Sequence, residues 1–427
     1  MTIYYTQNVD FYKGNSTEQL LKEFGSPLYI YSEEIFRKRC REMVGLVDYP
    51  HYKVTYSIKT NSNLTLLKIA REEGLHADAM SPGEIFVLEK AGFKPHEIFY
   101  ISNNVSEEEM KYAIDKGIDT SVDSLSQLDM YGRLNPGGKV AIRINPGVGA
   151  GHHAKVITAG DKTKFGINTE CIGKVKEILK KYGLTLKGIN QHIGSLFMDG
   201  SKYVESAKNT LNVAKQFDDL EFVDFGGGFG IPYRKQEGQP RLEIAEFGKN
   251  FGEMLREWAK EYKKDILFRS EPGRYISAES CILLGTVHAV KENHGTFFVG
   301  TDLGFNVLSR PIMYDSHHEI EQYRDGKIIT AGETVTANVV GNICESGDIM
   351  AKDRVLFIPK EKDLIAVMDA GAYGYSMASN YNNRLRPAEV LINTDGSVQL
   401  IRRRDTLEDL IRNVKGMTCG TVLKSER

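Results

Sequence analysis

Short apolar runs alternate with amphipathic stretches from about residue 27 to residue 275. Each apolar run ends in a polar or glycine-rich segment, and a stretch with helical periodicity follows it. Eight such alternations predict a (β/α)8 barrel, although periodicity alone leaves a doubly wound sheet open. The predicted strands are 53–59, 75–80, 98–103, 120–124, 139–146, 186–194, 222–229 and 266–273.

The pattern changes after residue 276, where apolar runs follow one another without helical stretches between them. This predicts a second, all-β domain. Its expected strands are 282–290, 295–301, 327–340, 353–358, 364–369 and 389–392, and a further strand is expected at 3–8. We therefore expect an N-terminal segment (1–26) packed with the β domain, a barrel over 27–276 and an all-β domain over 277–427.

Length, charge and cysteine usage narrow the class of protein. A chain of 427 residues exceeds the usual size of one core. Its formal charge of −2 argues against nucleic acid or an anionic membrane as a partner. No apolar run is long enough to span a membrane, and the first residues do not resemble a signal peptide. Five scattered cysteines without a Cys-x-x-Cys pair favour a cytoplasmic location.

Barrel enzymes carry their chemistry at the carboxyl ends of the strands. Lys59 stands at the end of the first predicted strand, after the apolar run 54–58. Dehydration there would lower the pKa of the amine and favour a Schiff base with a carbonyl cofactor. Taken alone, such a lysine more often reaches for water. The other polar strand ends are Asp78, Ser81, Asn103, Asp123, Asn145, His192, Glu271 and Arg274.

Glycines and a carboxylate end the last two barrel strands. The run 226–228 can present backbone N–H groups to a phosphate, or can simply form a tight turn. The lysine of a nucleotide P-loop is missing. Glu271 can keep a pyridine nitrogen protonated, and Arg274 can clamp a carboxylate or phosphate. A Pro-Gly turn with a surface ion pair explains the same residues more simply.

Histidines and one cysteine complete the candidate chemistry. His192 can act as an acid or base, or can stack on a cofactor ring, although a lone strand-end histidine is more often structural. Cys344, beside Glu345 in the β domain, is a candidate proton donor or a small packing residue. The adjacent pairs 152–153 and 317–318 have no partners at ligand spacing, so no metal site is expected.

Taken together, these segments resemble the fold type III pyridoxal-phosphate decarboxylases, specifically the diaminopimelate decarboxylase family. The resemblance covers about residues 25–415 and extends to the butirosin-type L-glutamyl-acyl-carrier-protein decarboxylases. The segments that carry it are 56–61 (YSIKTN), 78–84 (DAMSPGE), 164–167 (KFGI), 192–195 (HIGS), 224–228 (DFGGG), 271–274 (EPGR), 310–314 (RPIMY), 344–348 (CESGD) and 371–373 (GAY).

The resemblance implies pyridoxal 5'-phosphate as cofactor and a role for each matching residue. Lys59 would form the Schiff base, His192 would stack on the ring and Glu271 would face the pyridine nitrogen. The implied cofactor-binding residues are Lys59, Asp78, His192, Ser195, Gly228, Glu271, Gly273, Arg274 and Tyr373. The implied substrate-binding residues are Arg274, Arg310, Tyr314, Glu345 and Tyr373.

The resemblance also implies a head-to-tail homodimer with shared active sites. Cys344 and Glu345 would enter the site of the partner subunit. Lys59, Cys344 and His192 would then be the catalytic residues, with Cys344 as the proton donor. Glu345 would bind the distal amine of the substrate.

Two segments depart from the family pattern, both near the expected distal end of the substrate. Leu196-Phe197 stand where a glutamine is typical, and Asp315-Ser316-His317-His318 stand where the family usually has an alanine–tyrosine pair before a histidine. The expected reaction is decarboxylation of meso-diaminopimelate to lysine, in lysine biosynthesis. The alternatives are carrier-linked L-glutamate in butirosin-type antibiotic biosynthesis, D-lysine and D-ornithine.

Two other classes share parts of this pattern. An amino-acid racemase of similar barrel fold usually has arginine where this chain has Glu271. A non-catalytic pyridoxal-phosphate-binding protein would have lost Lys59 or Cys344, and both are present. The residues therefore favour a decarboxylase.

Overall fold

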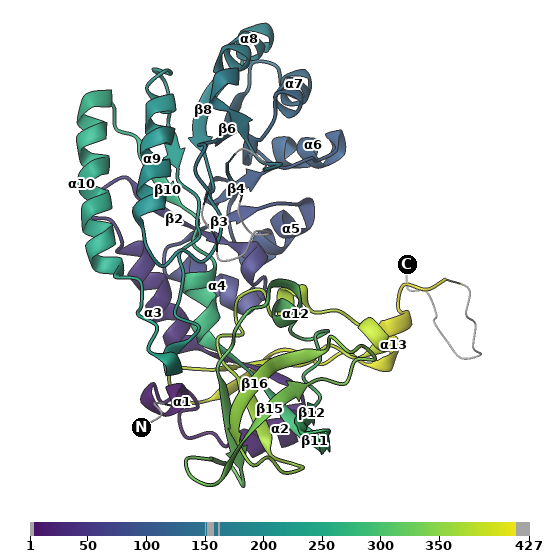
Figure 1. Cartoon of the computed structure of the whole chain (residues 1–427). Helices are drawn as coiled ribbons and strands as arrows, with labels where there is room; N and C mark the ends of the chain where they lie inside the picture. The colour runs from purple at the N-terminus through teal and green to yellow at the C-terminus, as the bar shows by residue number, and fades with distance from the viewer. Residues whose placement is uncertain (1–3, 150, 152–157, 161–162, 416–427) are drawn as a thin grey trace.

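Eight parallel strands close into a barrel in the computed structural model, which describes residues 4–149, 151, 158–160 and 163–415 (Figure 1). Pairing of Ser121 with Ala141 and of Phe268 with Tyr52 completes the ring, which excludes a doubly wound open sheet. The barrel strands are β2 (Tyr52–Ser57), β3 (His76–Ala79), β4 (Ile98–Ile101), β5 (Asp119–Val122), β6 (Lys139–Asn145), β8 (Thr185–Asn190), β9 (Phe222–Asp224) and β10 (Leu267–Ser270). The short strand β7 (Ile167–Asn168) extends β6.

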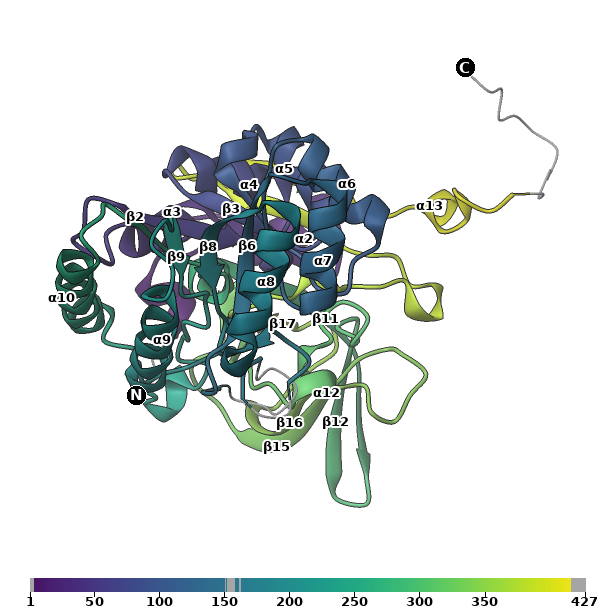
Figure 2. The same ribbon diagram turned by 90° about the horizontal axis from the view of Figure 1, so that it is seen from above.

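Helices lie outside the strands around the barrel, as Figure 2 shows. Serines at the strand exits begin several of them: the hydroxyl groups of Ser81, Ser106 and Ser124 each accept a backbone N–H at the helix start. The barrel helices are α3 (Glu33–Val44), α4 (Leu64–Glu72), α5 (Pro82–Ala91), α6 (Glu107–Asp115), α7 (Leu125–Leu134), α8 (Ile172–Tyr182), α9 (Ser201–Ala214) and α10 (Ile244–Tyr262).

The eight predicted barrel strands are all present, but several end earlier than predicted. The segment after β2 turns into η1 (Ile58–Thr60), and β9 stops at Asp224 before the glycine run. The apolar pattern continues past these points because the exits are themselves buried. At the functional residues, therefore, the buried stretch of chain extends beyond the end of the hydrogen-bonded strand.

The second unit is a ten-stranded sheet. The order of its central strands is β14-β13-β17-β11-β1-β18-β19, and β12, β15 and β16 continue from β11. The bounds are β1 (Leu28–Ser32), β11 (Cys281–Asn293), β12 (Thr296–Thr301), β13 (Ile320–Arg324), β14 (Lys327–Ile328), β15 (Thr334–Val340), β16 (Ile349–Phe357), β17 (Leu364–Val367), β18 (Ala388–Ile392) and β19 (Val398–Arg402). Short helices α11 (Arg274–Ser277), α12 (Arg310–Tyr314) and α13 (Leu407–Ile411) accompany this part of the chain.

Two expectations about the N-terminal region are wrong. Strand β1 pairs with β11 and β18, so the stretch after residue 27 belongs to the β sheet and the first barrel strand begins at Tyr52. The strand expected at 3–8 is replaced, over the described residues, by α1 (Tyr5–Asn8). In this helix the N–H of Thr6 donates to the carboxylate of Glu321 (3.1 Å). Helix α2 (Thr17–Phe24) follows.

Strand β1 is buried on both faces and contributes to two cores. Tyr29 and Tyr31 pack in the core that continues into the barrel. Leu28 and Ile30 face the smaller core that also includes Leu20 of α2. The alternation of side chains along one strand thus joins the N-terminal helices, the β sheet and the barrel.

A buried ionic network connects the barrel to the β domain. Glu279, whose side chain is fully buried, forms ion pairs with Arg39 (2.9 Å), Lys235 (3.3 Å) and Arg241 (2.6 Å). Lys235 also pairs with Asp369, just after β17 (2.6 Å). Burial alone would raise the pKa of Glu279, but the three cations outweigh it and lower that pKa to about 2.

No helix among the described residues has both the length and the apolar character needed to cross a membrane.

Replacing Glu279 by glutamine is expected to lower the free energy of unfolding by about 3–5 kcal/mol, because buried cations lose their counter-charge. The carboxylate's pKa lies below its usual value, so its stabilisation is complete above about pH 4.5 and is lost as the pH falls toward 2. Urea denaturation of wild type and Glu279→Gln across this range measures the difference. Glu261→Gln, at an exposed pair with Lys215, is the control and should cost at most about 1 kcal/mol. An equal effect of both variants contradicts the prediction.

Candidate active site

A cavity of about 290 Å³ opens at the carboxyl ends of the barrel strands. Four residues expected from the strand ends line it together: Lys59, Asn103, His192 and Glu271. The other lining residues are Met80, Ile101, Arg143, Thr158, Phe165 and Asn190. The barrel therefore brings an amine, an imidazole and a carboxyl group to one space.

Lys59 lies in η1, where its side chain is accessible from the cavity. The N–H of Ile58 donates to Oδ1 of Asp78 (3.1 Å), which fixes this turn against β3. Burial by itself would lower the pKa of Lys59. Tyr373, Asp78 and Glu271 outweigh burial and raise that pKa. These acidic groups therefore oppose the lowering of the pKa that dehydration of the amine would cause.

His192 is held as a neutral imidazole with a defined tautomer. The N–H of Gly227 donates to its Nδ1 (3.0 Å), so the ring proton resides on Nε2. Burial, followed by the nearby charges of Lys59 and Arg143, lowers the pKa of His192 well below its usual value. A fixed, uncharged ring suits stacking against a planar cofactor better than it suits proton donation as an imidazolium.

Glu271 presents an unsatisfied oxygen in a buried setting. Its Oε1 has no hydrogen-bond partner among the described residues, although the residue is only 5% exposed. Burial, then the neighbouring Asp224 and Asp78, raise the pKa of Glu271 well above its usual value. Buried polar atoms normally have partners. A protonated ring nitrogen bound in this cavity would supply the missing one.

The glycines expected to cradle a phosphate are sites where no side chain fits. Gly228 has φ +110°, and a Cβ there would lie 2.7 Å from the carbonyl oxygen of Gly194. A Cβ on Gly273 would lie 2.0 Å from Oγ1 of Thr60. The backbone therefore makes a close-packed wall at these two strand exits. Such a wall allows main-chain groups to approach an anion directly.

Two buried arginines lie around the ring of Tyr233. Arg274 donates to the hydroxyl of Tyr233 (3.0 Å) and to Oγ of Ser195 (2.8 Å). The Cζ of Arg310 lies 4.7 Å from the centre of the same ring. Burial, together with the charge of Arg274, lowers the pKa of Arg310 to about 10. Among the described residues, no carboxylate lies within ion-pair distance of either arginine.

The remaining expected residues divide between this site and the surface. The ring of Tyr373 lies beneath Arg274, with 4.9 Å between the ring centre and Cζ of the arginine. Tyr314 is close enough to Arg274 to raise the pKa of its guanidinium. Cys344 is exposed, and neither it nor Glu345 lines the cavity of its own chain. The structure of one chain thus does not bring the expected proton donor to Lys59.

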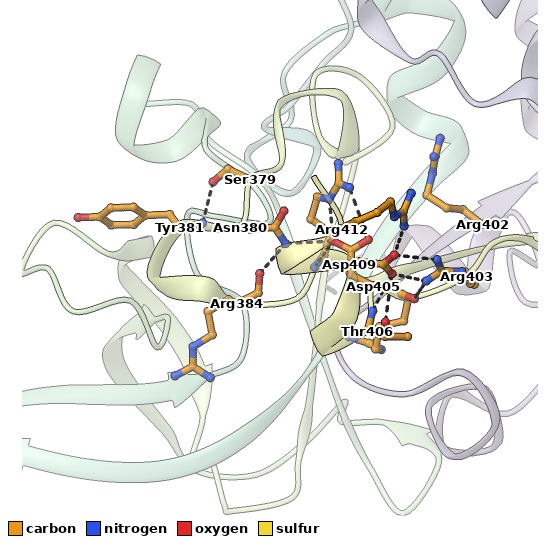
Figure 3. Close-up of polar contacts among 12 residues, drawn as sticks. Ser379, Asn380, Tyr381, Arg384, Arg402, Arg403, Asp405, Thr406, Asp409 and Arg412 are labelled. Carbon is orange, nitrogen blue, oxygen red and sulfur yellow. Dashed lines mark hydrogen bonds and ion pairs between the residues drawn. The ribbon is translucent and has the colours of Figure 1, made fainter. Parts of the chain in front are cut away.

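The surface loop with Cys344 is held by a second loop. The N–H of Cys344 donates to Oδ1 of Asn382 (2.8 Å), and the hydroxyl of Tyr381 donates to Glu345. Figure 3 shows this second loop against the C-terminal segment, where Asn380 donates to Asp405 (3.0 Å). The exposed pair therefore has an ordered position.

Sequence reasoning missed Arg143 and Tyr233. Arg143 lies on β6, buried against the ring of Phe165 (4.4 Å), and burial lowers its pKa to about 10. A charged residue inside an otherwise apolar strand was the available signal. Tyr233 had no such signal, because it lies in a loop. Of the histidine pairs, His317 and His318 contact arginines, while residues 152–153 lie outside the described part of the chain.

Comparison with known proteins decides the family. The model of the pyridoxal-dependent decarboxylases, pyridoxal binding domain, matches residues 33–278. Diaminopimelate decarboxylase of Methanothermobacter thermautotrophicus is 39% identical over 93% of this chain and 94% of its own. This chain belongs to the diaminopimelate decarboxylase family. The enzyme of that name from Zymomonas mobilis is 34% identical over 92% of this chain and 94% of its own.

Solved structures agree with the family. The crystal structure of diaminopimelate decarboxylase from Helicobacter pylori, complexed with L-lysine, superposes with a TM-score of 0.84 at 30% identity. The match covers 92% of this chain and 98% of that one. The expected barrel with an all-β second domain, and the expected family, are confirmed.

The cofactor of this family is pyridoxal phosphate, and the residues of the cavity fit it. The amine of Lys59 suits its aldehyde, the unsatisfied oxygen of Glu271 suits its ring nitrogen, and the wall at Gly228 and Gly273 suits its phosphate.

Gly228→Ala is expected to weaken pyridoxal phosphate binding at least about tenfold, because the added Cβ would intrude on the wall at Gly194. Fluorescence titration of the cofactor-free protein measures the affinity, and a melting curve shows whether the variant folds. Gly238→Ala is the matched control: its φ is also positive (+79°), but a Cβ there meets no heavy atom within 4 Å. Equal affinities for the two variants contradict the prediction.

Proposed function

We propose that this chain decarboxylates meso-diaminopimelate to lysine. The observation that carries the proposal is the junction of two features: a cavity with Lys59, neutral His192 and unsatisfied Glu271, and the buried arginines beside it. Tyr373 lies between the two features, since it raises the pKa of Lys59 and its ring lies beneath the guanidinium of Arg274. The family relatives with diaminopimelate decarboxylase as their name support the same substrate.

Each cavity residue has a proposed role toward the cofactor. Lys59 would bind it covalently through Nζ, His192 would lie flat against the ring, and Glu271 would keep the ring nitrogen protonated. Asp78 would act through the turn that carries Lys59. The proposed phosphate contacts are Ser195, Gly228, Gly273 and Tyr373. When bound, the cofactor supplies an electron sink for the pair released from Cα as carbon dioxide leaves.

Substrate orientation would depend on the arginines. Arg274, Arg310 and Tyr314 would bind a carboxylate at the far end of the substrate, which fixes which bond at Cα stands perpendicular to the ring plane. Two buried cations without a carboxylate partner among the described residues favour an anionic substrate group. Phe197, in the first of the two segments that depart from the family pattern, packs against the ring of Tyr203.

We further propose a homodimer in which Cys344 of one subunit completes the site of the other. Its thiol would donate the proton that replaces the departed carboxylate on Cα, and Glu345 would bind the distal amine. Exposed apolar side chains of Ile312 and Tyr381 near these residues favour a protein contact here. A head-to-tail arrangement would bury this surface twice.

The proposal also includes the division into domains and the location of the protein in the cell. We propose a division near residue 277, with β1 and the segment before it in the β domain. We also propose a cytoplasmic location, which the free cysteines among the described residues support.

A decarboxylation panel tests the substrate. Release of carbon dioxide is measured with meso-diaminopimelate, D- and L-lysine, D- and L-ornithine, and carrier-linked L-glutamate. We expect kcat/KM for diaminopimelate to exceed every other value by at least about 100-fold, because the other compounds lack the far-end amino-acid group. Preferred turnover of carrier-linked L-glutamate would contradict this and point to antibiotic biosynthesis.

A mixing experiment tests the shared site. Lys59→Ala and Cys344→Ala should each be inactive alone, yet their co-expressed mixture should recover about a quarter of wild-type activity. Half of the dimers are mixed, and each has one site with both residues intact. The control mixture of Lys59→Ala with His192→Ala should stay inactive, because both residues belong to the same barrel. No recovery in the first mixture would contradict the shared site.

A further inference from the structure

The guanidinium of Arg310 is held by two residues just beyond α12. Asp315 has φ +50°, a left-handed turn that brings the chain back toward Arg310. The hydroxyl of Ser316 then accepts a hydrogen bond from Nη2 of Arg310 (3.2 Å). His318 contacts Nη1 of the same side chain through its Nε2 (2.8 Å). The loop thus folds over its own helix and meets both ends of the guanidinium fork.

His318 contacts Arg310 as a neutral acceptor. Its Nδ1 lies 2.7 Å from the carbonyl oxygen of Met368, which can only accept, so the ring proton resides on Nδ1. Nε2 is therefore left with a lone pair for the N–H of Arg310. Burial and the charge of Arg310 lower the pKa of His318 well below its usual value, which keeps the ring uncharged.

Two of the five N–H donors of Arg310 are thereby committed, and three are left for other partners. The contacts at Nη1 and Nη2 fix the plane of the fork. A fixed fork binds a carboxylate better than a rotating one, because less side-chain freedom is lost on binding. Neither contact neutralises the charge, so Arg310 keeps its full attraction for an anion.

We infer that Ser316 is a positioning residue that sets how tightly the site holds the far-end carboxylate of the substrate. The inference rests on the proposed function. Ser316 acts through Arg310 and need not touch the substrate. It also lies in the second of the two segments that depart from the family pattern.

The chain offers a matched control beside Arg310. Ser309 is also a buried serine, but its hydroxyl has no hydrogen-bond partner among the described residues. Removing that hydroxyl therefore leaves the contacts of the guanidinium unchanged. A difference between the variants at 316 and 309 isolates the hydrogen bond from the general effect of losing a serine.

Two ligands separate the far-end carboxylate from the rest of the molecule. Decarboxylation at one end of meso-diaminopimelate leaves the other carboxylate in place, so L-lysine retains the group that Arg310 would bind. Cadaverine has the same carbon chain with neither carboxylate. Calorimetry with the cofactor-loaded protein measures the Kd of each, and initial rates measure kcat and KM for meso-diaminopimelate.

Ser316→Ala is expected to raise the KM for meso-diaminopimelate and the Kd for L-lysine by about 3- to 10-fold, the range for losing one hydrogen bond to a charged group. The kcat should stay within about twofold, and the Kd for cadaverine should not change. Ser316→Thr, which keeps the hydroxyl, and Ser309→Ala should both match wild type. Should Ser316→Ala not fold, Ser316→Cys replaces it, since sulfur is a similar size but a weak acceptor.

Two results would overturn the inference: an unchanged Kd for L-lysine in the Ser316 variant, or equal weakening of L-lysine and cadaverine. Failure of the proposed function shows separately, as absence of wild-type turnover of meso-diaminopimelate. The comparison of L-lysine with cadaverine decides the role of Ser316 in that case too.

Discussion

The site depends on the hydrogen bonds that the carbonyl oxygen of Thr60 accepts from the β domain. This oxygen accepts the N–H of Tyr373 (2.9 Å) and the hydroxyl of Ser376 (3.1 Å), both from the β domain. Beside it, Asn61 donates to the carbonyl of Gly371 (3.1 Å). These three bonds join the turn that carries Lys59 to the loop that carries Tyr373. The barrel alone would supply a lysine in a cavity, and the second domain supplies the wall next to it.

The two sides of the site differ in whether their cationic side chains have acidic neighbours. Around Lys59, Tyr373, Asp78 and Glu271 raise the pKa of the amine against the effect of burial, while burial raises the pKa of both carboxyls. Around Tyr233, the two arginines have no carboxylate partner among the described residues. The first arrangement suits a cofactor with a cationic ring nitrogen, and the second suits a substrate with an additional carboxylate. Together they match the chemistry of a decarboxylase for a dicarboxylic amino acid.

The order of the barrel was predictable because both of its signals are local. Apolar runs and helical periodicity alternate along the chain, and strand ends in a closed barrel must meet at one rim. That is why the pattern of strand ends suffices to group Lys59, His192 and Glu271. The N-terminal strand could not be assigned to its sheet, because β1 pairs with β11 and β18, which lie more than 240 residues away. A short, largely apolar strand such as β1 carries no information about which distant strand it pairs with.

The sequence by itself determined the alternation of strands and helices, the all-β second domain, the residues at the strand exits and the family that these residues resemble; the closure of the barrel rests on strand pairing. Only the tertiary structure decided which groups shift the pKa of Lys59, the tautomer of His192 and the presence of Arg143 in the cavity, because each depends on groups from several strands. It likewise showed Cys344 at the surface of its own chain. Spacing along a chain specifies which groups are available, whereas burial and non-local neighbours set their protonation and their contacts.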